Sequence, residues 1–286
     1  KGLQRLEYRG YDSSGVAIHN SKKVNVFKQK GKVQDLIDFA ANKDTKGKLA
    51  IGHTRWATHG LPNDINAHPH QSGDKKISLV HNGIIENYAI LKEELEQRGH
   101  QFESETDTEV LVHLIEEIHK NSKYDLFDAV RIALNEVIGA YAIVIINSDN
   151  PNELIAARKS SPLVVGIGER EYFCASDATP IIEYTKNVVY LEDGEIAQIS
   201  LTNGLKLKTI ANQEKTPYIQ ELEMHLEALE KGGYDHFMLK EIYEQPQSIK
   251  DSMRGRISIS KSKVALGGIL DYEEKLINAK RLIFVA

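Results

Sequence analysis

Ile77-Ser-Leu-Val-His-Asn-Gly83 is the stretch from which the fold is predicted. Its apolar residues are typical of a strand, and Asn82-Gly83 places a turn at the end of that strand. A helix is predicted over residues 84–98, because Gly99 is a residue type that often lies just beyond a helix C-terminus. A second helix opens at Thr106-Asp-Thr-Glu109, which fits a capping box, and continues with apolar residues at helical spacing. The stretch therefore predicts helices that pack on a sheet.

The segments on either side extend this pattern. Strands are predicted at Gly15–Ile18, Leu49–His53 and Ala140–Ile146, and helices over residues 33–42 and 125–138. From residue 153 to residue 210 the pattern changes to short β segments, and Asp193-Gly194 and Asn203-Gly204 are typical of two-residue hairpin turns. The order of strands, helices and strands predicts an α+β fold, with helical layers on antiparallel sheets.

Both ends of the chain suggest a piece of a longer protein. The chain starts at Lys1, where Leu3 and Leu6 indicate an amphipathic turn already under way. It ends at Arg281-Leu-Ile-Phe-Val-Ala286, an apolar run typical of a buried strand. From Glu221 the pattern becomes helical, with acidic and basic residues mixed, so we expect a domain boundary near residues 215–222.

The composition limits the classes of function. Apolar residues make up 41% of the 286 residues and charged residues 27%, as in a soluble globular protein, and no apolar run is long enough to span a bilayer. The net charge of -5 is spread over interspersed acids and bases, which argues against a nucleic-acid-binding protein. The single cysteine, Cys174, excludes an intrachain disulfide and fits the reducing cytoplasm.

Five histidines lie close together in the sequence and allow two interpretations. They are His53, His59, His68, His70 and His81. His68-Pro-His70 resembles a pair of metal ligands, but neither a nearby cysteine nor an HExxH helix supports zinc. Histidines satisfied by hydrogen bonds are the favoured interpretation, and the pattern alone leaves the metal site open.

Three polar positions are candidates for binding a ligand. Asn82-Gly83 has an amide side chain beside a flexible backbone N–H, which suits an oxyanion hole, although a simple tight turn explains the same pair. Arg55, followed by Trp56, suits a carboxylate, and a surface arginine stacked on the indole is the alternative. Asp107 either complements a helix dipole or binds an ammonium group.

Other catalytic patterns are weak. Cys174 in Tyr-Phe-Cys-Ala-Ser-Asp177 fits a buried strand and has no charged neighbour that would activate a thiolate. Ser161-Pro162 and Ser176-Asp177 lack the Gly-x-Ser-x-Gly sequence of a serine hydrolase. Neither a Walker A nor a Gly-x-Gly-x-x-Gly sequence is present, so the chain has no nucleotide-binding fingerprint.

Five blocks of sequence, in this order, carry a resemblance to a known family. They are Glu7-Tyr-Arg-Gly-Tyr-Asp-Ser13, His53-Thr-Arg-Trp-Ala-Thr-His-Gly60, Asn66-Ala-His-Pro-His70, His81-Asn-Gly-Ile-Ile-Glu-Asn87 and Ser104-Glu-Thr-Asp-Thr-Glu-Val110. Together they resemble the glutaminase domain of the glutamine–fructose-6-phosphate aminotransferases, the glucosamine-6-phosphate synthase family. Glutaminases that act with phosphoribosylpyrophosphate or form asparagine share some of these blocks. Phe237-Met-Leu-Lys-Glu-Ile-Tyr-Glu-Gln-Pro246 favours the first family, because it is similar to the entry of its sugar-phosphate isomerase domain.

The resemblance implies the domains and the fold. Residues 1–220 are expected to form a type-2 glutamine amidotransferase domain, an N-terminal nucleophile hydrolase αββα sandwich whose first strand is missing. Residues 221–286 are expected to hold the linker and the start of a sugar-isomerase (SIS) domain. The family nucleophile is an N-terminal cysteine, for which Cys174 is no match, so the chain as given is expected to be inactive.

The resemblance also implies the roles of the site residues. Asn82 and Gly83 would hold the oxyanion, Arg55 the α-carboxylate of L-glutamine and Asp107 its α-ammonium group. Four further residues are assigned to the same pocket: Thr58 and His59 line it, Arg9 supports it, and Trp56 gates the passage of ammonia. The resemblance implies that this site holds no metal and that the reaction needs no cofactor.

The implied activity is the transfer of glutamine-derived ammonia to fructose 6-phosphate, which gives glucosamine 6-phosphate and glutamate. A cytoplasmic homodimer is expected for the intact enzyme, with the fructose 6-phosphate site in the isomerase domain. Two alternatives stay open: a related amidotransferase with another acceptor, and a non-catalytic pseudoenzyme module.

Overall fold

The computed structural model describes residues 1–286 except 8–10, 223–233, 254–256, 259–262, 265–272 and 282–286. Arg9 and residues 282–286 of the predicted C-terminal strand therefore lie outside the described residues. The chain divides into two compact units, Lys1–Met224 and His225–Ala286. The domain boundary predicted near residue 220 stays a prediction. Within the described residues, no helix combines the length and the apolar character that a bilayer crossing requires.

The first unit contains three sheets and several helices. Its described helices are α1 (Gly2–Leu6), α2 (Val33–Ala40), α3 (Tyr88–Gln97), α4 (Asp107–Asn121) and α5 (Leu126–Glu136). The three-stranded sheet has the order β2-β1-β3, with β1 (Ser13–His19), β2 (Val24–Lys30) and β3 (Leu49–Arg55). The four-stranded sheet has the order β14-β10-β8-β9, with β8 (Val164–Ile167), β9 (Tyr172–Ala175), β10 (Asn187–Tyr190) and β14 (Gln220–Glu221).

A seven-stranded sheet forms the centre of this unit. Its order is β13-β12-β11-β7-β6-β5-β4, with β4 (His70–Gln71), β5 (Ile77–Ile85), β6 (Gly139–Asn147), β7 (Asn150–Lys159), β11 (Glu195–Ser200), β12 (Gly204–Thr209) and β13 (Glu214–Lys215). The second unit contains α7 (Phe237–Met253), β15 (Ile257–Ser258), β16 (Lys263–Val264) and α8 (Glu273–Ile277).

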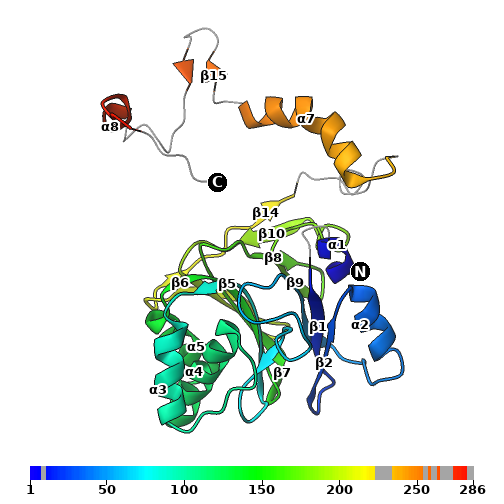
Figure 1. Ribbon diagram of the computed structural model, residues 1–286, viewed down its shortest axis with the longest axis vertical. Coiled ribbons are helices and arrows are strands. Elements are labelled where there is room, and N and C mark those ends of the chain that lie inside the picture. Colours follow the sequence, from blue (N-terminus) through cyan, green and yellow to red (C-terminus); the bar gives the residue numbers. More distant parts are fainter. Residues whose placement is uncertain (8–10, 223–233, 254–256, 259–262, 265–272, 282–286) are drawn as a thin grey trace. The chain divides into compact units, whose positions relative to one another are not determined.

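Strand β6 shows why the central sheet is covered on both faces. Tyr141, Ile143 and Ile145 lie in a core shared with the apolar faces of α3, α4 and α5, which cover one side of the sheet (Figure 1). The alternate residues Ala142 and Val144 lie in a second core. Because successive side chains of a strand point to opposite faces, an almost continuous apolar run is needed here.

The second core joins the central sheet to the two smaller sheets. It contains Ala17 and Ile51 from the three-stranded sheet and Val165 and Val189 from the four-stranded sheet. Helix α2 packs against β1 and β2 of the three-stranded sheet, and its buried residues include Leu36. The layers are therefore helix, sheet, sheet and helix, and the strand pairs given above are antiparallel. This confirms the predicted αββα sandwich.

Strand β5 is longer than the sequence predicted. Residues 82–85 pair with β6, from Asn82 opposite Ala142 to Ile85 opposite Gly139, so they stay in the sheet instead of opening a helix. Helix α3 begins at Tyr88, not at residue 84. Gly99 has a φ of 95° just beyond the end of α3, which confirms the predicted helix end.

The two predicted hairpin turns have different outcomes. Asn203-Gly204 lies in a hairpin between β11 and β12, although Ser200 pairs with Gly204, so three residues form the loop. The Asp193-Gly194 prediction was wrong. It connects β10 of the four-stranded sheet to β11 of the seven-stranded sheet, and these strands do not pair with each other. Asp193 instead accepts a hydrogen bond from Arg158 Nη2 at 2.7 Å.

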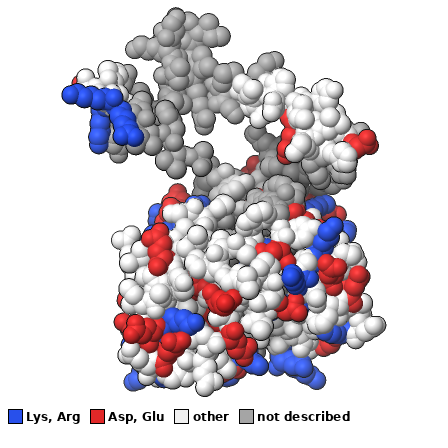
Figure 2. Space-filling view, viewed as in Figure 1, with Lys and Arg blue, Asp and Glu red and all other residues white. Residues whose placement is uncertain are grey.

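On the face of the first unit seen in Figure 2, acidic and basic side chains lie interspersed, as the sequence predicts.

Candidate active site

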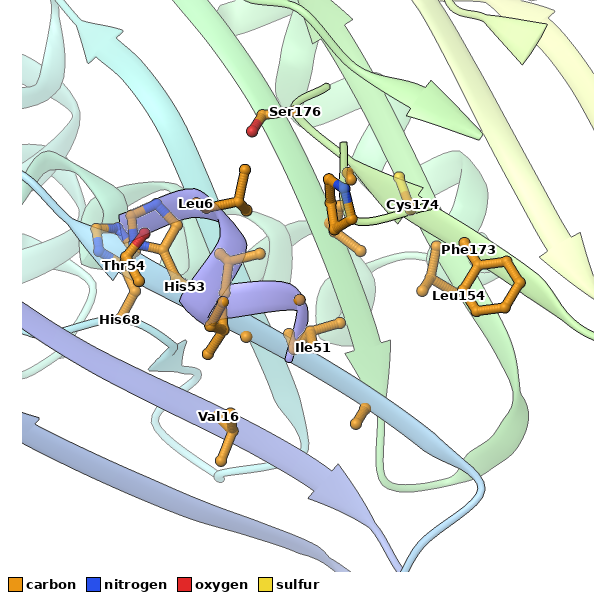
Figure 3. Close-up of a pocket in the computed structure, with 18 of the residues that line it drawn as sticks. Leu6, Val16, Ile51, His53, Thr54, His68, Leu154, Phe173, Cys174 and Ser176 are labelled. Atoms are coloured by element: carbon orange, nitrogen blue, oxygen red, sulfur yellow. The ribbon is translucent and has the colours of Figure 1, made fainter. Parts of the chain in front are cut away.

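The first unit contains a cavity of about 1120 Å³. Residues of β3, β5 and β9 line it, and Figure 3 shows His53, Thr54 and His68 on one side and Leu154, Phe173 and Cys174 on the other. All described residues of the predicted site line this one cavity, namely Arg55, Trp56, Thr58, His59, Asn82, Gly83 and Asp107. The structure thus brings together residues that lie on separate elements of the first unit, from the end of β3 to the start of α4.

Arg55 ends β3, and its side chain is fixed by the loop that follows. It is only 3% exposed, and Nη2 donates hydrogen bonds to the carbonyl oxygens of His59 and, at 3.2 Å, Gly60. Nη1 lies 3.5 Å from Asp12 Oδ1 and is buried without a hydrogen-bond partner among the described residues. A buried guanidinium held by its other nitrogen suits the recognition of a carboxylate.

Asp12 is a site residue that the sequence reasoning did not identify. Its N–H donates to the Arg55 carbonyl at 2.7 Å, and its Oδ2 accepts the Ala57 N–H. One carboxylate therefore holds both the guanidinium and the start of the loop. The only signal in the sequence is its place in the Arg-Gly-Tyr-Asp-Ser block.

Asp107 lies opposite this loop, in the first turn of α4. It is 3% exposed, and its Oδ2 accepts the Ile85 N–H at 2.8 Å. The other oxygen, Oδ1, lies 3.9 Å from His59 Nδ1. His59 thus touches both partners, Arg55 through its carbonyl and Asp107 through its ring. The positive and negative groups of the site face a common space.

The start of α4 is fixed by a modified form of the predicted capping box. Thr106 Oγ1 accepts the Glu109 N–H at 3.3 Å, as predicted. The Glu109 carboxylate, however, accepts the N–H groups of Glu103 and Ser104 at 2.9 Å and 2.7 Å instead of reaching the Thr106 N–H. Hydrogen bonds tie the preceding loop to the helix, and this holds Asp107 in place.

Asn82 is oriented by His53, the second residue whose role the sequence reasoning missed. Asn82 Oδ1 lies 2.9 Å from His53 Nε2. Burial lowers the pKa of His53 to about 4, so the ring is neutral near pH 7. Because a carboxamide oxygen only accepts, His53 Nε2–H is the donor, and the Asn82 NH₂ group is free to donate into the cavity.

Gly83 occupies a position that no other residue fits. Its φ is 135°, and a Cβ atom would lie 2.1 Å from the Ala140 carbonyl oxygen. A side chain here would force β5 away from β6. The sequence could only show that a glycine follows Asn82, whereas the structure shows that the sheet itself requires it.

We expect Gly83→Ala to lower the free energy of unfolding by about 2 kcal/mol or more, because backbone strain adds to the clash with Ala140. Gly99→Ala is the matched control, since Gly99 also has a positive φ but no atom of the described residues within 4 Å of its Cβ position. Urea unfolding of both variants measures the difference. Equal losses for the two variants would contradict the role assigned to the Ala140 contact.

The remaining histidines form a neutral, hydrogen-bonded wall. His68 Nε2 and His81 Nδ1 lie 2.9 Å and 3.0 Å from Thr108 Oγ1, and His70 Nε2 lies 3.1 Å from Thr106 Oγ1. Burial lowers the pKa of His70 to about 3, that of His68 well below its usual value and that of His81 in the same direction. These contacts favour the hydrogen-bonded interpretation of the cluster over the metal site.

Cys174 lies on β9 and faces the same cavity (Figure 3). Burial raises the pKa of its thiol to about 12, so the thiol is protonated near neutral pH. Only the thiolate is a strong nucleophile, and Cys174 is therefore poorly suited to attack an amide.

Trp56 and Thr58 form the rim of the site. Trp56 is 68% exposed, and Thr58 Oγ1 lies 3.3 Å from His59 Nδ1. The gating role expected of Trp56 and the support expected from Arg9 stay predictions, and Arg9 lies outside the described residues.

Comparisons with known proteins agree on one kind of domain. Residues 53–183 match a family described as a glutamine amidotransferase domain. The chain is 60% identical over its whole length to a glutamine–fructose-6-phosphate aminotransferase (isomerizing) of Bacteroides thetaiotaomicron, and 50% identical to one of Chlorobaculum tepidum. It spans 47% of the length of each relative.

A solved structure shows the same similarity at the level of the fold. The glutamine phosphoribosylpyrophosphate amidotransferase from B. subtilis is 30% identical, with a TM-score of 0.62 over 73% of this chain and 45% of that one.

Proposed function

Since the chain belongs to the glutamine amidotransferase family that includes the glutamine–fructose-6-phosphate aminotransferases, we propose that it supplies the glutaminase half of such an enzyme. The intact enzyme would convert L-glutamine and fructose 6-phosphate to glutamate and glucosamine 6-phosphate. One observation carries the proposal: Arg55, Asp107 and Asn82-Gly83 surround a single cavity that suits an amino acid with an amide side chain.

Each group matches one part of glutamine. Arg55 would bind the α-carboxylate through its buried Nη1, and Asp107 would bind the α-ammonium group through its buried carboxylate. The Asn82 NH₂ group and the Gly83 N–H would donate to the side-chain oxygen of the substrate, since both residues line the cavity. Thr58 and His59 line the same space.

The proposed reaction passes through a thioester. A cysteine thiolate forms a bond to the side-chain carbon of glutamine, and the carbonyl oxygen becomes an oxyanion held by Asn82 and Gly83. The intermediate collapses with cleavage of the C–N bond, and a proton delivered to nitrogen lets ammonia leave. Water then hydrolyses the thioester to glutamate. An α-amino group with a pKa of about 7.7–8.0 can carry the proton near neutral pH.

We infer that the thiolate comes from a cysteine outside residues 1–286. The high pKa of Cys174 argues against its use, and the family resemblance points to an N-terminal cysteine carried by a strand. The cavity supports this inference. Strand β3 is an edge strand of the three-stranded sheet, β9 is an edge strand of the four-stranded sheet, and both line the cavity. A strand seated between these two edges would join the smaller sheets and bring its first residue to the polar groups.

The other parts of the proposal rest on the resemblance. Residues 221–286 would link the glutaminase to a sugar-isomerase domain that binds fructose 6-phosphate, and the intact enzyme would be a cytoplasmic homodimer. The alternatives, another acceptor or a non-catalytic module, are not favoured by the relatives that match the entire chain.

One assay tests the nucleophile and the acceptor together. We expect residues 1–286 alone to release no glutamate from glutamine, and the full-length gene product to form glucosamine 6-phosphate from glutamine and fructose 6-phosphate. Cys174→Ala in the full-length protein should keep full activity. Glutamate release by residues 1–286, or loss of activity in Cys174→Ala, would overturn the inference about the nucleophile, and transfer to phosphoribosylpyrophosphate instead would overturn the acceptor.

A further inference from the structure

A second polar cluster lies outside the cavity described above. It is formed by His100, which follows α3, and by His113 and Glu116 on α4. One ligand atom from each residue lies within 4.8 Å of the other two. His113 and Glu116 project from the same face of α4 because they are three residues apart.

The distances within the cluster match those around a small cation. His100 Nδ1 lies 2.8 Å from His113 Nδ1, and Glu116 Oε2 lies 3.8 Å and 3.5 Å from these two nitrogens. A point about 2.0 Å from all three atoms fits inside this triangle, which is the usual distance from zinc to imidazole nitrogen or carboxylate oxygen. The alternative to a cation is an N–H···N hydrogen bond between the two histidines. That bond would not involve Glu116, because its Oε2 is too far from either imidazole nitrogen to accept a hydrogen bond.

Glu116 is held in position by groups that leave room for a further ligand. Its Oε2 accepts the Gly73 N–H at 2.8 Å, and its Oε1 accepts the Asp74 N–H at 3.0 Å and Lys120 Nζ at 2.6 Å. The positively charged Lys120 ammonium group therefore contacts Oε1, and not the Oε2 atom that lies nearer to the two imidazoles. A carboxylate oxygen has two lone pairs, so Oε2 can still bind a cation.

The histidines are also supported from outside. His100 Nε2 lies 3.0 Å from Glu117 Oε2. Because a carboxylate only accepts, Nε2 carries the proton, and Nδ1 has an unprotonated lone pair that can bind a cation. His113 Nε2 lies 3.8 Å from Glu109 Oε1. Carboxylates behind the imidazoles are typical of metal-binding histidines, whose orientation they fix.

We propose that His100, His113 and Glu116 bind a divalent transition-metal ion, for which Zn²⁺ is the best match. Two imidazole nitrogens and one carboxylate oxygen are a donor set that zinc prefers, whereas Mg²⁺ prefers oxygen ligands in an octahedron. The three residues line a separate cavity of about 580 Å³, so water can complete the coordination. The site joins α4 to the segments around residues 73 and 100, and it does not depend on the glutaminase proposal.

Titration of the untagged chain with zinc tests the site. Calorimetry measures the affinity, and metal analysis after dialysis measures the amount of zinc bound. We expect one Zn²⁺ per chain and no Mg²⁺ bound. His100→Gln and His113→Gln should each weaken zinc binding about tenfold or more, because each removes one of three ligands. His119→Gln is the matched control, since it lies on the same helix outside the cluster and should bind zinc as the unaltered chain does.

Thermal unfolding provides a second readout. Zinc should raise the Tm of the unaltered chain and of His119→Gln, because a ligand that binds the folded state stabilises it, but not that of His100→Gln. Circular dichroism without metal checks the fold of each variant. If the variant of the buried His113 does not fold, the variant of the partly exposed His100 tests the proposal. An absence of zinc binding, or equal affinity in His100→Gln and the control, would overturn the proposal.

Discussion

We expect Asn82→Ala in the full-length gene product to lower kcat for glutamine hydrolysis about 10²–10³-fold, the usual loss when one oxyanion-hole donor is removed. The KM for glutamine changes little, because the Asn82 amide gains strength only when the side-chain oxygen becomes an anion. His53 fixes the carboxamide so that its NH₂ group faces the cavity. Steady-state release of glutamate measures both constants.

Asn135→Ala is the control for this experiment. Asn135 is an exposed asparagine on α5 whose NH₂ group donates to the Arg131 carbonyl at 2.8 Å, and it does not line the cavity. Its kcat should stay within about twofold of the unaltered enzyme, as for most surface substitutions. If Asn82→Ala kept its kcat, or lost glutamine affinity instead, Asn82 would not be an oxyanion donor.

The sequence predicts those parts of the fold that depend on local patterns. The apolar run of β6 marks a strand covered on both faces, and Thr106 marks the start of α4. The error at Asp193-Gly194 has a physical cause: turn propensity is local, whereas β10 pairs with β8 and β11 with β7 and β12, in two different sheets. The same holds for residues 82–85, which remain a strand because β6 pairs with them.

The site residues likewise differ in whether the sequence could identify them. Arg55, Asn82 and Asp107 belong to sequence blocks that resemble a family, so the resemblance could name them. The contributions of Asp12 and His53 are contacts to other strands and loops, and no spacing rule predicts which carboxylate faces Arg55 or which imidazole faces Asn82. The zinc cluster was missed for a related reason, because His100 meets His113 only after the chain turns between α3 and α4.

Arg55→Lys in the full-length gene product should raise the KM for glutamine about 10–100-fold and leave kcat much less affected. A hydrogen bond to a charged group contributes about 1.5–3 kcal/mol, and lysine cannot reproduce the two-pronged contact with a carboxylate. Lysine is preferred to alanine as the first variant because it keeps a positive charge beside Asp12. This matters because Arg55 is only 3% exposed, so its removal would leave Asp12 without its ion-pair partner. Arg55→Ala should weaken glutamine binding at least as much.

A substrate change separates carboxylate binding from a general loss of structure. If Arg55 contacts the α-carboxylate, the unaltered enzyme should prefer L-glutamine strongly over the analogue in which that carboxylate is an amide. Arg55→Lys and Arg55→Ala should lose most of this preference, because the group that distinguishes the two substrates has been changed or removed. A variant that binds glutamine weakly but keeps the full preference would show that Arg55 only shapes the loop through His59 and Gly60. The carboxylate would then have another partner, because specificity is a difference between two binding free energies, and Arg55 would not contribute to that difference.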